Sequence, residues 1–89
     1  MFLHIGNGKS VRKKDVIGIF DLDTATITKT GKDFINRMQR EGKVEYNDDD
    51  LPRSFVLIEE DKKYKLNLSR ISSRGLASRA NESGYDKEN

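Results

Sequence analysis

This 89-residue chain has no cysteine and no tryptophan, and it has one histidine and one proline. Without cysteine it forms no disulfide and no thiolate zinc site, a composition that fits the reducing cytosol. The lone His4 gives no basis for a Ser/His/Asp triad. No apolar stretch approaches the roughly 20 residues that span a bilayer, and no signal peptide is visible. We therefore expect a cytoplasmic protein with no membrane partner, no cofactor and no enzymatic activity.

Hydrophobic residues are scarce as well, at 34% of the chain against 36% that are charged. A chain this short buries only a modest share of its surface, so one copy alone would be marginally stable. We expect one domain over residues 1–80 that assembles into a homo-oligomer, of which a closed ring is one form. Residues 81–89, "NESGYDKEN", have nothing with which to build a core and are predicted to be a disordered tail.

The formal net charge is only +2, but the charges are segregated along the chain. Residues 9–14 carry four basic side chains and no acid, and residues 62–79 are also basic without acids. Between them lie the acidic runs Asp48–Asp50 and Glu59–Asp61. Separate basic blocks are typical of a surface that meets a polyanion.

Periodicity predicts an α+β fold with a small antiparallel or mixed sheet. The predicted strands are Phe2–Ile5, Asp15–Leu22, Lys43–Tyr46, Arg53–Glu60 and Tyr64–Leu68. The second of these is apolar and β-branched around Gly18, which indicates a strand buried on both faces or passing close to another backbone. Gly6-Asn7-Gly8 predicts a tight turn after the first strand, with a solvated or phosphate-contacting basic stretch after it.

Two helices are predicted, one main and one short. Phe34, Ile35 and Met38 lie on one face of a helix over residues 29–41, with Thr28 or Thr30 as its N-cap. Gly42 stands at the position of a C-terminal cap. Near the end of the chain, Ser72 or Ser73 begins a short helix that packs Ile71 and Leu76 onto the core.

Three features suggest chemistry that their context does not support. "GNGKS" ends like a phosphate-binding loop, but its glycines are too closely spaced and no helix follows. Asp48–Asp50 lacks the alternating spacing and distal Glu of a calcium loop, so we interpret it as a solvated loop. His4 lies within a strand pattern and is interpreted as a residue of a sheet edge or subunit contact rather than as a base or ligand.

Several segments together resemble a known family. "FLHIGNGKSVRKKDVIGIFD", "NRMQREGKV" and "PRSFVLIEEDKKYKLNLSRISSRGLASR" are similar to the bacterial extracellular matrix regulatory proteins RemA and RemB, and more so to the RemB branch. The resemblance covers roughly residues 1–80. It implies a cytoplasmic DNA-binding regulator of biofilm matrix genes. In the RemA branch the subunits form a ring that presents basic residues to DNA.

The resemblance also points to candidate DNA contacts. Lys13, Lys14 and Arg53 are the expected phosphate contacts, with Arg37 and Arg40 on the main helix as secondary candidates. The RemA branch has a basic residue at the position of Asp15. It also has adjacent arginines where this chain has only Arg53, preceded by three aspartates. A bound duplex would be held by weak attractions repeated in each subunit, with specificity from DNA curvature.

Other interpretations of these residues stay open. Arg37 and Arg40 also fit an ordinary exposed helix face in which Asp33 pairs with Arg37. The basic residues near the C-terminus fit solvated or subunit-interface charges; they are Arg70, Arg74 and Arg79. The alternative to DNA binding is an oligomeric adaptor that contacts a protein partner, and the acidic Asp48–Asp50 run favours it.

Overall fold

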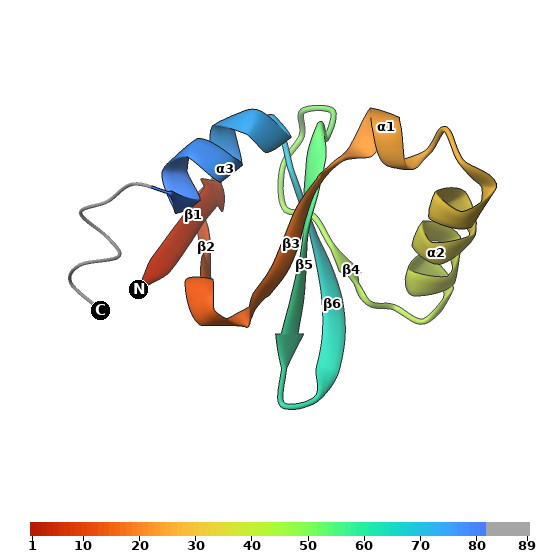
Figure 1. Cartoon of the computed structure of the whole chain (residues 1–89), viewed down its shortest axis with the longest axis horizontal. Coiled ribbons are helices and arrows are strands. Elements are labelled where there is room, and N and C mark those ends of the chain that lie inside the picture. Colours follow the sequence, from red (N-terminus) through yellow and green to blue (C-terminus); the bar gives the residue numbers. More distant parts are fainter. Residues whose placement is uncertain (82–89) are drawn as a thin grey trace.

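The structure is a computed structural model that describes residues 1–81. Within this range, the strands and helices follow one another along the chain in the order given by the colours of Figure 1. The strands are β1 (Phe2–Gly6), β2 (Lys9–Arg12), β3 (Val16–Asp21), β4 (Val44–Glu45), β5 (Ser54–Glu60) and β6 (Lys63–Ser69). The helices are the 3₁₀ turn η1 (Lys13–Asp15), α1 (Leu22–Ala25), α2 (Lys29–Arg40) and α3 (Ser73–Ala80). The fold is therefore mixed α+β.

A four-stranded sheet of order β3-β5-β6-β4 forms the middle layer. β3, β5 and β6 are antiparallel, whereas the short β4 runs parallel to β6, so the sheet is mixed. The separate β1–β2 hairpin and α3 lie on one side of it, and α2 lies on the other (Figure 1). The predicted main helix and short terminal helix thus cover opposite faces.

The core has two halves because side chains alternate across the strands of the central sheet. On the hairpin side, Val56 of β5 packs with residues of β1, β2 and α3, including the fully buried Leu76. On the α2 side, Phe55 and the fully buried Leu66 pack against Met38. β5 is buried on both faces, which explains its nearly continuous apolar sequence.

The predicted helix ends are confirmed. Thr28 is the N-cap of α2, and its hydroxyl accepts a hydrogen bond from the Gly31 amide at 3.0 Å. Gly42 follows the helix with φ of +71°, a conformation that glycine adopts without strain. Ser72 caps α3 in the same way, accepting from the Gly75 amide at 3.1 Å.

The prediction that the second apolar run is buried on both faces is wrong. β3 pairs only with β5 in the described sheet, so it is an edge strand, and Ile17 and Phe20 are 50% and 42% exposed. Gly18 makes room for a ring rather than for a backbone, because a Cβ there would lie 2.7 Å from the Phe20 side chain. That ring stacks on Phe55 with a centroid distance of 5.1 Å.

The basic stretch after the first turn also folds differently from the prediction. The Gly6–Gly8 turn joins β1 to β2, and Lys9–Arg12 is a strand whose Val11 is buried in the core. A short helix, α1, interrupts the Thr-rich connection after β3, with Asp21 as its cap. The predicted tail disorder concerns residues that lie outside the described range, except for Asn81, which ends α3.

Candidate nucleic-acid interface

The structure places the predicted DNA contacts in separate regions of the chain. Lys13 and Lys14 form η1, immediately before β3, whereas Arg53 precedes β5 beside the far end of β3. β3 has six residues, so about 20 Å of strand separates these two regions. One copy therefore presents them as two sites rather than as one patch.

The secondary candidates lie on a third surface. Arg37 and Arg40 line a shallow groove along α2 together with Phe34, on the side of the sheet opposite the hairpin. The expected Asp33–Arg37 pair is wrong, since the Asp33 carboxylate binds the Lys29 ammonium at 2.9 Å. The Arg37 guanidinium instead lies over the Phe34 ring, 5.8 Å from its centroid.

Asp15, next to the candidate contact Lys14, is paired within the chain. The Arg12 Nε donates to the Asp15 carboxylate at 2.8 Å, and the Asp15 side chain is only 14% exposed. A second guanidinium nitrogen of Arg12 reaches Glu60 at 3.2 Å. The hydrogen bond and charge of Asp15 raise the pKa of Arg12 above its ordinary value. Asp15 thus faces an arginine, and the exposed Lys14 lies beside an acid whose charge is partly offset.

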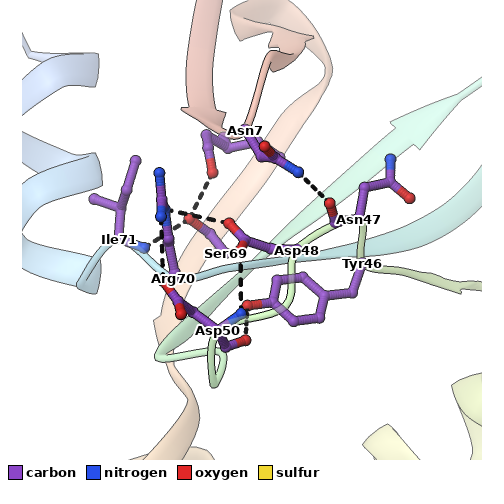
Figure 2. Close-up of polar contacts among 9 residues, drawn as sticks. Asn7, Tyr46, Asn47, Asp48, Asp50, Ser69, Arg70 and Ile71 are labelled. Atoms are coloured by element: carbon purple, nitrogen blue, oxygen red, sulfur yellow. Dashed lines mark hydrogen bonds and ion pairs between the residues drawn. The ribbon is translucent and has the colours of Figure 1, made fainter.

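The acidic run Asp48–Asp50 is not a simply solvated loop, which corrects the prediction. Arg70, at the end of β6, binds Asp48 at 3.2 Å through Nε and Asp50 at 3.1 Å through Nη1 (Figure 2). The Asp48 side chain is only 12% exposed. Hydrogen bonding to Asp50 and the charge of Asp48 raise the pKa of Arg70 above its ordinary value. Arg70 is therefore paired within the chain, while its side chain stays 49% exposed.

Further contacts fix this loop to the rest of the fold (Figure 2). The Tyr46 hydroxyl donates to the Asp50 carbonyl, and the Asn7 side-chain amide donates to the Asn47 carbonyl. Partial burial, and then the charge of Asp48, raise the pKa of Tyr46 above its ordinary value of 10.0. A raised pKa means that the folded state binds the Tyr46 proton more tightly than the unfolded state does. The resulting contribution to folding stability is present below pH 10 and is lost as the pH rises through the pKa of the folded state.

The pairing of Arg70 with Asp48 and Asp50 predicts that this arginine holds the loop in place. Replacing Arg70 with alanine is expected to speed hydrogen exchange of the Asp50 amide, whose bond to the Asp48 carboxylate at 3.1 Å depends on a fixed loop. Arg74→Ala removes a comparable exposed arginine from α3 and is the control. Equal exchange rates in both variants would show that Arg70 does not hold the loop.

Arg74, Arg79 and His4 are the other residues that the sequence singled out. Arg79 donates to the His4 carbonyl at 3.3 Å and so connects α3 to β1, whereas Arg74 is exposed. His4 is an exposed residue of β1 whose ring nitrogen lies 3.4 Å from the Ser10 hydroxyl on the paired strand. Within residues 1–81, no three His, Asp or Glu side chains gather closely enough to hold a metal ion.

Sequence reasoning missed the pairs of Arg12 with Glu60 and of Arg70 with Asp48 and Asp50 because the partners lie far apart in the chain. Charge alternation along one helix is visible in a sequence, but a pair between Arg12 and Glu60 is not.

A scan against models of protein families finds no match to this chain. A search of curated proteins also finds no match. Among the helices of residues 1–81, none has the length and apolar character needed to cross a membrane.

Proposed function

We propose that this chain is a cytoplasmic, non-enzymatic DNA-binding regulator of the extracellular matrix regulatory kind, acting as a homo-oligomer. One observation carries the proposal: three of the acids beside the candidate contacts are engaged by arginines of the same chain. Asp15 binds Arg12, and Asp48 and Asp50 bind Arg70. Their repulsion of phosphates is therefore reduced, and the exposed Lys14 and Arg53 keep their attraction for a duplex.

The spacing of the basic sites supports an oligomer. Each neutralised phosphate adds roughly one unit to the salt dependence of DNA binding, so one chain with scattered cations binds weakly. Several chains in one assembly repeat each contact along the duplex and multiply its effect. In this proposal the duplex contacts Lys13, Lys14 and Arg53 of successive subunits, with Arg37 and Arg40 as secondary contacts, and DNA curvature supplies specificity.

The outer edge of β3 is a suitable surface for subunit pairing. Between Val16 and Phe20 the strand has neither a charge nor a proline, the usual protections of a sheet edge. Ile17 and Phe20 are half exposed there. A second copy that pairs with this strand would satisfy its free backbone groups and cover both side chains.

Replacing Ile17 with lysine is therefore expected to reduce the assembled mass measured by light scattering, because a charge within an edge strand opposes pairing. Ile27→Lys is the matched control, since Ile27 is 77% exposed but lies between α1 and α2, away from the β3 edge. A variant at Ile17 that assembles like the control and the parent would rule out pairing through β3.

Binding of a curved duplex at two salt concentrations tests the proposed function. We expect retention at low salt that weakens steeply as salt is added. A protein that assembles but retains no duplex at low salt would overturn DNA binding and favour the adaptor alternative. Retention that is insensitive to salt would contradict the phosphate-contact mechanism.

A further inference from the structure

A buried amide on β6 lacks a hydrogen-bond partner. Asn67 is 2% exposed, and its Nδ2 is the buried side-chain nitrogen left unpaired within residues 1–81. Burying an amide donor without an acceptor is destabilising, because the donor loses its hydrogen bonds to water. The neighbouring polar side chain on the same face of β6, Ser69, does have a partner, since its hydroxyl donates to the Ile5 carbonyl at 2.7 Å. The unpaired donor therefore marks a place where an acceptor fits.

Asn67 lines a groove between the β1–β2 hairpin and the central sheet. This hairpin–sheet groove has a volume of about 280 Å³ and lies between β2 on one side and β4, β5 and β6 on the other. Its walls include Phe2, Lys9, Val11, Ile58 and Lys65. The groove is close in size to the roughly 300 Å³ at which small-molecule sites begin.

The charges at the Asn67 end of the groove are not balanced. Lys9 and Lys65 both lie 3.6 Å from the same carboxylate oxygen of Glu45, the β4 residue paired with Asn67. These distances are too long for good hydrogen bonds, so both ammonium groups keep donors for another acceptor. Two cations against one carboxylate leave one excess positive charge beside the unpaired amide.

The other end of the groove has apolar walls and no excess positive charge. Phe2 is 59% exposed, and Val11 and Ile58 form buried wall beside it. The guanidinium of Arg12 is already engaged by two carboxylates, those of Asp15 and Glu60, so this end carries one excess negative charge and disfavours a second anionic group. A ligand that follows this pattern has a singly charged acidic head and an apolar body.

We propose that the hairpin–sheet groove binds a small carboxylate with an apolar body. The carboxylate accepts a hydrogen bond from Asn67 Nδ2 and lies between Lys9 and Lys65, and the apolar part lies against Phe2, Val11 and Ile58. A monoanion matches the single excess positive charge at the Asn67 end, and the apolar wall gives it an advantage over inorganic phosphate. This site is separate from the DNA contacts proposed above and does not depend on them.

Titration of the ¹⁵N-labelled full chain with hexanoate tests the proposal. The side-chain NH₂ signals of Asn67 should move and saturate in the millimolar range, while those of the exposed Asn36 on α2 stay in place. Acetate should bind more weakly, because each buried methylene contributes up to about fourfold in affinity. Hexylammonium, with the same apolar body and the opposite charge, should leave the Asn67 signals unmoved.

A charge variant separates this site from general anion binding. Lys65→Gln should weaken hexanoate binding by up to about fivefold, in the range of an exposed ion pair. Lys32→Gln removes the same charge from α2, on the other side of the sheet, and should leave affinity unchanged. The proposal is overturned if hexanoate leaves the Asn67 signals in place, if hexylammonium moves them equally, if inorganic phosphate binds more tightly, or if the two variants behave alike. Duplex DNA binding is measured in a separate experiment, so a failure of the carboxylate site and a failure of the proposed DNA binding can be told apart.

Discussion

Replacing Gly31 with alanine is expected to destabilise the fold by about 3 kcal/mol, the upper range for overpacking. A Cβ at this position would lie 1.9 Å from the Ala25 carbonyl oxygen and 3.0 Å from its carbon. Both are backbone atoms of α1, so the contact is relieved only by moving α1 away from α2. The measurement is the free energy of unfolding from urea titration.

Lys32→Ala is the control for this change, because Lys32 is the next residue of α2 and its side chain is exposed. We expect an effect within about 0.5 kcal/mol there, as for most surface substitutions. Equal stability of the Gly31 variant and the parent would contradict the close contact between α1 and the start of α2.

The sign of the Gly31 effect could not be predicted from sequence. Glycine within a helix costs about 1 kcal/mol relative to alanine, so helix propensity alone predicts that alanine stabilises α2. The contact that reverses this sign comes from α1, a four-residue helix that the Thr-rich connection did not reveal. Local propensity is readable from a sequence, but the approach of two elements is not.

Removing two of the proposed phosphate contacts together should nearly abolish duplex binding at physiological salt. Lys14→Ala combined with Arg53→Ala is expected to lower affinity by about 25-fold or more, from roughly fivefold per phosphate contact at about 0.15 M salt. The loss grows with the number of subunits that contact the duplex. Fluorescence anisotropy with a labelled curved duplex measures it.

Lys63→Ala combined with Arg74→Ala is the matched control, since it also removes one exposed lysine and one exposed arginine. We expect a much smaller loss of affinity, caused only by the change in net charge. If both double variants lose affinity equally, the duplex responds to overall charge, and the assignment of Lys14 and Arg53 as contacts is wrong.

Much of the fold followed from local sequence signals. The caps Thr28 and Ser72 and the position of Gly42 were predicted because each depends on a side chain or a φ angle within a few residues. The edge position of β3 was not predicted, because an apolar strand has the same sequence pattern in the middle of a sheet and at its edge. Which strands lie on either side is decided by tertiary pairing.

The candidate site was predicted less well for a related reason. The lysines and arginines could be named from the sequence, but not which of them are already engaged. Arg70 was interpreted as a solvated or subunit-interface charge, and nothing in the sequence indicated that it binds Asp48, 22 positions earlier in the chain. The unpaired amide of Asn67 could not be predicted from the sequence. The alternation of side chains along β6 indicates which face of the sheet Asn67 occupies, but not which groups cover that face.

The salt dependence of duplex binding by the unmodified chain tests the central claim most directly. One chain offers five candidate cations, and at about 0.9 per contact these give a slope of log affinity against log salt no steeper than about −4.5. An assembly that repeats Lys14 and Arg53 along the duplex predicts a steeper slope. A slope shallower than this limit, or no binding at low salt, would contradict the account.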